Sequence, residues 1–382
     1  MSLIHRRLIM AAGLALAFQT ALAQQKVIKI ANVIELSGAG TTSGTNFKNG
    51  VELAIKEINA TGGILGHRLE SYTVDTQSNP GVAKGLAQKA VDDGVFAVFG
   101  PVFSGSILVS MAETRKAEVP NFTGGEAAAI TKQGNPYIFR TSFTQDTAMP
   151  EVARYIANTL KAKTVAVIYV NNDFGKGGRD AIAKALQPMG VSVSTDISTE
   201  QSQIDFSAAV LKAKQANSDV VFAYLNEEES ARLLRELRKQ GVSKPIVGET
   251  VLTSQKVIEL AGEAANGAVA HVGLTVDAPL PSIRAFRAKF EKAYNYVSDH
   301  NGVKGYTGVY IMKAAIEKVG KVDRKAMAQA MKGLKIKASE HPGVLMDVSF
   351  DDNGDLDRES FLAEARNGKQ EIKEVLPALS TK

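Results

Sequence analysis

The sequence contains no cysteine, which excludes disulfide bonds, thiol catalysis and thiolate metal sites. It also lacks a strong net charge, because 43 of its 45 basic residues follow residue 23, against 40 acidic residues. That balance gives no reason to expect nucleic acid as a partner. Beyond residue 23, no apolar run approaches the roughly 18 residues of a membrane-spanning helix. We therefore expect a soluble mature protein that is held together by its apolar core.

The first 23 residues have the pattern of an export signal. A basic segment at residues 5–7 precedes an apolar run at residues 8–18 and an Ala-Leu-Ala cleavage site at residues 21–23. An uncleaved membrane anchor is the alternative, and the short apolar run disfavours it. The missing cysteine excludes a lipid-anchored form. We predict a signal peptide at residues 1–23 and an exported mature protein that begins at Gln24.

Residues 27–101 alternate between strands and helices with very little spacer. A strand at 27–34 is followed by a glycine-rich turn at 36–44 and by a helix whose apolar residues recur every 3.6 positions. Two further strands end at Asp75 and Gly100. Strands that alternate with helices this tightly predict a parallel sheet. Ligands of such sheets bind outside the carboxyl ends of the strands, so this stretch also predicts where the site lies.

The same rhythm starts again after a break near residue 143. The strand at 164–170 is nearly free of polar residues, as expected in a parallel sheet that is buried on both faces. Helices and strands then alternate up to residue 249. The two series share a rhythm but no sequence repeat. We therefore predict an α/β protein with two doubly wound parallel-sheet lobes.

The chain after residue 265 breaks the alternation, because the helices predicted at 282–297, 305–319 and 323–333 have no strands of their own. We expect these helices to pack on the first lobe, and a last strand pair in the tail to return to the second. In that arrangement the chain crosses from one lobe to the other three times, near residues 143, 273 and 347. Several short connections between two lobes form a hinge. The predicted N-terminal lobe comprises residues 24–143 and 274–346, and the predicted C-terminal lobe comprises residues 144–273 and 347–382.

Three segments match a known family: NGVELAIKEINATGGILGHRLE (49–70), VFGPVFSGS (98–106) and NNDFGKGG (171–178). They resemble the periplasmic solute-binding proteins of branched-chain amino acid ABC transporters. DDNGDLD (351–357) fits the turn that these proteins place before their final strands. The resemblance covers residues 27–375 in order and implies a two-lobed, leucine-binding-protein-like type I binding protein that closes on its ligand. Relatives in this group also bind amides, urea or aromatic acids, so the resemblance implies the scaffold more closely than the ligand.

The glycine-rich turn must be compared with dinucleotide-binding loops. Gly38, Gly40 and Gly44 have a spacing one residue longer than the usual fingerprint, and Asp75 lies too far along the chain to be its acidic partner. We interpret the turn as a cleft loop whose helix N-terminus offers free N–H groups. The resemblance places Ser43 at the mouth of the cleft. We predict no cofactor.

Ser104 follows the third strand and opens the next helix. From the sequence alone it is either the N-cap of that helix or a hydroxyl offered to a ligand carboxylate beside the helix N-terminus. The resemblance favours the second interpretation, because a Ser at this position commonly holds the ligand carboxylate. No neighbouring His or acid marks Ser104 as a nucleophile.

Gly124 and Glu126 follow the fourth strand. The resemblance implies that Gly124 contacts the ligand through its main chain. Glu126 stands where relatives often have a Thr that contacts the ligand's amino group. A carboxylate there would pair with an ammonium group and repel a carboxylate. The alternative is a solvated charge in the first turn of a helix.

The resemblance implies three ligand-binding residues in the second lobe. Phe174 matches an aromatic residue that closes over the ligand, with an ordinary buried Phe as the alternative. Asn226 stands where amino-acid binders often have Tyr. Glu249 lies near the position of an acid that grips the ligand amine, and the register leaves Thr250 as a rival. We interpret the acids at 227–229 as first-turn charges of the following helix.

Neither a metal site nor an active site is visible. Residues 351–357 do not match a calcium loop, because glycine stands at position 4 instead of 6 and Leu362 takes the place of the glutamate at position 12. The histidines of the mature chain lack metal-ligand spacing. No nucleophile–base pair is present, so we do not expect an enzyme.

We predict a periplasmic receptor that binds a small amine-bearing solute, an amino acid or a relative, between its lobes and delivers it to an inner-membrane ABC permease. We expect the receptor to be monomeric. An aromatic acid or an amide is the alternative ligand, and a ligand sensor is the alternative role. The predicted ligand-binding residues are Ser43, Ser104, Gly124, Glu126, Phe174, Asn226 and Glu249.

Overall fold

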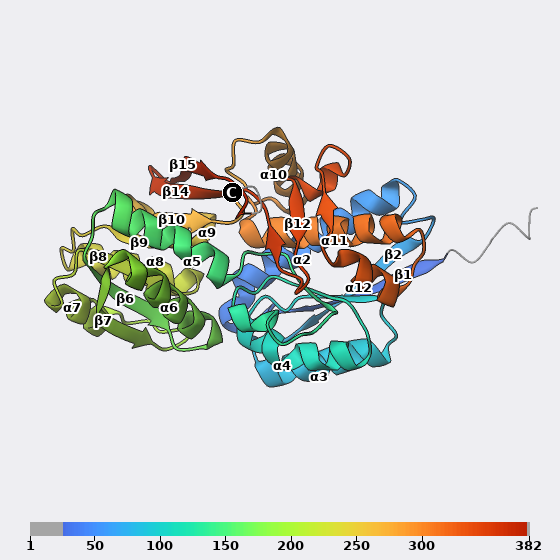
Figure 1. The fold of residues 1–382 in the computed structure, drawn as a ribbon, viewed down its shortest axis with the longest axis horizontal. Coiled ribbons are helices and arrows are strands. Elements are labelled where there is room, and N and C mark those ends of the chain that lie inside the picture. The colour runs from blue at the N-terminus through green and yellow to red at the C-terminus, as the bar shows by residue number, and fades with distance from the viewer. Residues whose placement is uncertain (1–25, 380–382) are drawn as a thin grey trace, which may run out of the picture.

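The computed structural model describes residues 26–379. The predicted signal peptide, residues 1–23, lies outside the described residues. The molecule consists of two halves that lie side by side, each with a β-sheet covered by helices (Figure 1). This arrangement confirms the predicted α/β fold with two parallel sheets. Within the described residues, no helix combines the length and the apolar character needed to cross a membrane.

The first half contains a five-stranded parallel sheet with the strand order β2-β1-β3-β4-β5. The apolar sequence VIKIANVI forms its second strand, β1, which is buried from Ile30 onward because helices cover both faces of the sheet. All pairings are parallel, so the carboxyl ends of the five strands meet at one edge. The elements are β1 (Val27–Ile34), α2 (Thr41–Ala60), β2 (Arg68–Asp75), α3 (Pro80–Asp92), β3 (Ala97–Phe99), α4 (Ser104–Lys116), β4 (Asn121–Thr123) and β5 (Ile138–Arg140).

The second half contains a seven-stranded sheet with the order β15-β14-β10-β9-β8-β6-β7. Its first five strands in the sequence are parallel, and the last two pair antiparallel beside β10. The elements are α5 (Gln145–Arg154), β6 (Thr164–Val170), α6 (Asp173–Leu186), β7 (Ser192–Thr199), α7 (Ser207–Gln215), β8 (Val220–Tyr224), α8 (Glu227–Lys239), β9 (Ile246–Glu249), α9 (Gln255–Ala261), β10 (Val269–Val272), β14 (Ser360–Arg366) and β15 (Lys369–Leu376).

Three helices between β10 and the small sheet described next lie against the first half: α10 (Pro281–Tyr294), α11 (His300–Val319) and α12 (Arg324–Met331). In Figure 1, α10 and α11 lie beside the blue α2 and α12 lies beside α11, whereas β14 and β15 lie beside the green and yellow second half. The contact between α11 and α2 is very close. A Cβ atom at Gly50 would lie 2.0 Å from the carbonyl oxygen of Gly302, and one at Gly305 would lie 2.1 Å from that of Phe47. Glycine at these positions lets α11 bring its first turn to the edge where the strands of the first sheet end.

A small antiparallel sheet precedes the last two strands. It consists of β11 (Lys335–Ile336), β12 (Val348–Phe350) and β13 (Leu356–Asp357). The apolar side chains of β12 and β13 belong to the same core cluster as β1, α2 and α11, and the chain joins the seven-stranded sheet only at Ser360. Residues 347–357, which the sequence assigned to the C-terminal lobe, therefore pack with the first half.

The turn between β12 and β13 is stabilised by hydrogen bonds among its own residues. The Asp351 carboxylate accepts the N–H groups of Asn353 and Asp355, each at 2.9 Å. A Cβ atom at Gly354 would lie 2.1 Å from the carbonyl oxygen of Ile138, so the turn also packs tightly against β5. Within residues 26–379, no group of three His, Asp or Glu side chains is placed to hold a metal ion.

Candidate functional site

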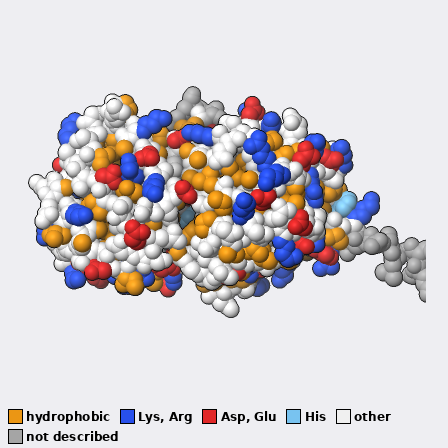
Figure 2. All heavy atoms as spheres, turned by 90° about the horizontal axis from the view of Figure 1, so that it is seen from below, with side chains coloured by type: hydrophobic (Ala, Val, Ile, Leu, Met, Phe, Trp, Pro, Cys, Tyr) orange, Lys and Arg blue, Asp and Glu red, His pale blue; other side chains and the backbone are white. Residues whose placement is uncertain are grey.

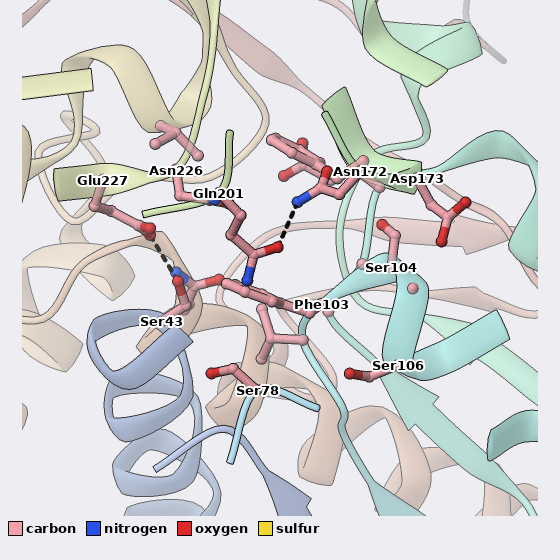
Figure 3. A pocket seen from close by; sticks show the side chains of 18 of the residues that line it. Ser43, Ser78, Phe103, Ser104, Ser106, Asn172, Asp173, Gln201, Asn226 and Glu227 are labelled. Carbon is pink, nitrogen blue, oxygen red and sulfur yellow. Dashed lines mark hydrogen bonds between the residues drawn. The ribbon is translucent and has the colours of Figure 1, made fainter. Parts of the chain in front are cut away.

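A cavity of about 260 Å³ lies between the two halves, at the carboxyl ends of both sheets. Figure 2 shows a small hollow at the boundary between the halves, and Figure 3 shows the side chains that line the cavity. The N-terminal half and α11 contribute Ser43, Ser78, Pro80, Val102, Phe103, Ser104, Gly105, Ser106, Gly124, Gly125, Glu126, His300, Asn301 and Lys304. The second half contributes Asn172, Asp173, Phe174, Lys176, Gln201, Asn226, Glu227 and Val251.

The start of α4 is held in place by a buried carboxylate. The side chain of Glu35, which follows β1, accepts the N–H groups of Val102 and Phe103 at 3.0 and 3.1 Å. Burial raises the pKa of Glu35. The N-cap of α4 is Phe103, which cannot accept a capping hydrogen bond, so the N-cap interpretation of Ser104 is wrong. Ser104 instead accepts the N–H of Ala127 at 3.2 Å, which leaves its own hydroxyl proton for a ligand.

The loop after β4 is fixed by Arg140, which is fully buried. The Arg140 guanidinium donates to the carbonyl oxygens of Gly125 and Ala127, and the Ser142 hydroxyl also donates to that of Gly125, at 2.8 Å. The loop held by these hydrogen bonds places Gly124 and Glu126 in the wall of the cavity.

Glu126 is part of a buried ion pair. Its carboxylate lies 3.1 Å from the Lys304 ammonium, and its second oxygen accepts the Tyr224 hydroxyl at 3.0 Å. Lys304 is 4 % exposed and Glu126 is 7 % exposed, so a solvated first-turn charge is the wrong interpretation. Burial and the nearby Glu249 raise the pKa of Glu126 to about 7, although Lys304 opposes the shift. Because the Lys304 ammonium group already pairs with the Glu126 carboxylate, Glu126 is not available as an unpaired anion for a ligand ammonium group.

Glu249 is buried and does not line the cavity. One oxygen accepts the Thr250 hydroxyl at 2.5 Å and lies 3.4 Å from Nδ1 of His271. No amide, hydroxyl or ammonium group of the described residues donates to the other, buried oxygen, but the Glu126 carboxyl lies within hydrogen-bonding reach of the Glu249 side chain. Burial raises the pKa of Glu249 and lowers that of His271 to about 4. Thr250, the rival for the same role, does not line the cavity either.

Glu227 connects the two halves across the cavity. Its carboxylate accepts the Ser43 hydroxyl at 2.8 Å (Figure 3), and the next residue, Glu228, accepts the Thr42 hydroxyl at the same distance. Burial and the nearby Asp299 and Glu228 raise the pKa of Glu227 to about 8. Among the described residues, no Lys, Arg or His lies within 4.0 Å of this carboxylate. Glu227 is thus a first-turn residue of α8, as the sequence indicated, but it is also a buried, uncompensated acid that faces the cavity.

The aromatic wall comes from both halves. Phe174 is partly exposed to the cavity and stacks on Tyr224 with 4.2 Å between ring centroids, so it is not an ordinary buried Phe. Phe103 lies on the other wall. Asn226 lines the cavity as the N-cap of α8, and its amide donates to the Glu229 carboxylate at 3.1 Å.

Six of the seven predicted residues therefore line one cavity, and their role in binding a ligand stays a prediction. The first turn of α11 was missed, although it supplies His300, Asn301 and Lys304. A signal for it existed: Asp299 is the N-cap of α11 and accepts the N–H groups of Asn301 and Gly302. Aspartate before such a segment is a recognised helix start.

Comparison with known proteins agrees with this geometry. The family model described as periplasmic binding protein matches residues 27–370. The Leu/Ile/Val-binding protein BraC3 of Rhizobium johnstonii is 29% identical over 336 residues, which cover 87% of this chain and 90% of that protein.

Solved structures have the same fold. LivJ of Streptococcus pneumoniae, a branched-chain amino acid transporter substrate-binding protein in complex with isoleucine, superposes with a TM-score of 0.81 at 26% identity, covering 92% of this chain and 99% of that one. A solute-binding protein of R. palustris in complex with benzoate superposes with a TM-score of 0.84 at 21% identity, covering 92% and 97%. This chain belongs to the periplasmic binding protein family, with the leucine-binding-protein-like type I architecture.

Proposed function

We propose that this protein is the periplasmic solute-binding receptor of an ABC importer, that it binds a small amine-bearing solute in the cavity between its halves, and that it delivers this solute to an inner-membrane permease. The family and its transporter relatives support the role. The observation that carries the ligand class is Glu227, a buried acid that faces the cavity without a cation. A buried carboxyl without a cation is costly to ionise, and a ligand ammonium group would remove that cost.

The opposite side of the cavity is suited to a carboxylate. The N-terminus of α4 lies there without a side-chain cap, and its N–H groups favour a negative charge. The Ser104 hydroxyl proton and the Ser106 hydroxyl, which is buried without a partner, lie in the same turn. Figure 3 places these two serines apart from Ser43 and Glu227. A solute with its ammonium and carboxylate groups at separate ends would engage both sides.

An aromatic acid is the second candidate, because Phe103 and Phe174 offer apolar surface on opposite walls of the cavity. Its carboxylate would take the same place at the start of α4. The two candidates differ at Glu227, which would pair with an amine but would only donate or accept a hydrogen bond to an aromatic acid.

A thermal-shift screen of residues 24–382 against amino acids, other amines, amides and aromatic acids tests the proposal. A ligand present at about 100 times its dissociation constant stabilises the folded protein by about 2.7 kcal/mol, which raises the melting temperature measurably. We expect the largest shifts from amine-bearing solutes. If no amine shifts the melting temperature at millimolar concentration, the amine proposal is wrong.

The affinity for an amine-bearing solute should rise with pH. The pKa of Glu227 is raised to about 8 in the ligand-free protein, so its carboxyl is protonated at lower pH. An ammonium group beside it lowers this pKa, so binding releases a proton and the affinity rises by at most about tenfold per pH unit between about pH 6 and 8.

Isothermal titration calorimetry at three pH values, in buffers with different ionisation enthalpies, measures the affinity and the proton released. The Glu227→Gln variant is the control, because it has no proton to release at this position. An affinity that does not change over this range would favour the aromatic acid.

A further inference from the structure

We propose that a second cavity, beside the link between β13 and β14, binds a small carboxylate with an apolar body. This cavity measures about 490 Å³ and shares no residue with the first one. Its volume falls within the range of roughly 300–1,000 Å³ that is usual for small-molecule sites. Much of its wall is apolar, from Leu280, Ile336, Leu345, Met346, Val348 and Pro377.

Arg358 is the residue that points to an anion. It lines this cavity, is 3 % exposed and has no carboxylate within 4.0 Å among the described residues. Its Nη2 donates to the carbonyl oxygen of Thr141 at 3.3 Å, and its guanidinium lies 5.6 Å from the ring centroid of Phe143. Its Nε has no hydrogen-bond partner within residues 26–379. Burial without an acidic partner lowers the pKa of Arg358 to about 9, and an anion in the cavity would offset that cost.

The N-terminus of α10 is a second, independent feature of the same cavity. Its N-cap is Leu280, which cannot cap, and Pro281 at the first position has no N–H. The Ser282 hydroxyl donates to the carbonyl oxygen of Leu345 at 2.6 Å and does not cap the helix either. The remaining N–H groups of this turn, in a helix of 14 residues, favour an anion.

The other charged groups of the cavity are three acids and two lysines, so the preference for an anion rests on Arg358 and the start of α10. Asp347 pairs with Lys337 at 2.7 Å. Asp357 accepts the N–H of Leu379 at 3.0 Å, and Glu359 is exposed. Lys335 adds a cation at the rim. An anionic head beside Arg358 and the start of α10, with an apolar body against the remaining wall, is therefore the ligand chemistry that this cavity fits.

Three probes, octanoate, acetate and octan-1-ol, separate the contribution of the anionic head from that of the apolar body. Titration of residues 24–382 should show that octanoate binds at least tenfold more tightly than acetate, which lacks the tail, and octan-1-ol, which lacks the charge. Amide NMR shifts should move at residues 335–338 and 345–349 and not at residues 104–106. Octanoate that shifts only residues 104–106, or no binding at millimolar concentration, would overturn the proposal.

Two variants test the cavity itself. Arg358→Met removes the charge, and Ala338→Phe fills the cavity while it leaves Arg358 in place. Both should lose at least tenfold in octanoate affinity, whereas Arg358→Lys should lose less. The melting temperature of each variant shows whether it folds. The affinity of the first cavity for a solute that shifts the melting temperature of the wild type should be the same in the variants as in the wild type. Octanoate affinity that is unchanged in the folded Ala338→Phe variant would overturn the proposal, because octanoate would then not occupy this cavity. Octanoate affinity that is unchanged in the folded Arg358→Met variant would also overturn it, and Arg358 would then only tie the link to Thr141.

Discussion

Glu227→Gln is expected to weaken the binding of an amine-bearing solute by about 100-fold, which corresponds to about 2.8 kcal/mol. The Gln side chain still accepts the Ser43 hydroxyl, so the contact between the halves is preserved. The variant loses only the charge that would face the ligand ammonium. Isothermal titration calorimetry at about pH 9, above the pKa of about 8 of Glu227, measures the difference with the wild-type carboxyl ionised.

Glu228→Gln is the matched control, because Glu228 makes the equivalent contact with Thr42 but does not line the cavity. Its affinity should stay within about threefold of the wild type, since Glu228 is only partly buried and lies outside the cavity, where a change of a single charge is worth little. Equal affinities for the wild type and Glu227→Gln would refute the pairing of Glu227 with an ammonium group.

The pattern of strands was predictable because it depends on local composition. The strands expected at 27–34 and 164–170 coincide with β1 and β6, since long apolar runs with few polar residues form the buried strands of parallel sheets. The helix expected at 305–319 begins five residues earlier, at His300. Its first turn is polar and contains glycine, and only the close packing against α2 explains those residues.

The charges of the site were less predictable, because each is decided by a partner far away in the sequence. Glu126 was predicted as a ligand for an ammonium group, but Lys304, 178 residues away, already occupies that position. Glu227 was interpreted as a helix-start charge, and its burial depends on the opposite half of the molecule. Composition and spacing carry no information about such contacts, and the resemblance transferred positions without their environments.

Lys304→Met is expected to destabilise the protein by about 3 kcal/mol at about pH 8.5, because it leaves Glu126 buried without its cation. The loss should be smaller near pH 6. The pKa of Glu126 is already raised to about 7 and rises further without Lys304, so the carboxyl is protonated at the lower pH. An acid whose pKa is raised in the folded state loses stability as the pH increases through that pKa, which gives the sign of the effect.

The double variant Lys304→Met/Glu126→Gln separates the charge from the packing. It removes both charges, so we expect it to recover most of the lost stability and to remove the added pH dependence. Tyr224 can still donate its hydroxyl to the Gln side chain. Denaturant unfolding of the wild type, Lys304→Met and the double variant, each at two pH values, measures the six free energies that this comparison needs. A single variant as stable as the wild type at the higher pH would mean that the pair contributes only packing. A double variant as unstable as the single one would mean that Lys304 acts through the Gly124 carbonyl oxygen, 3.3 Å from its ammonium group.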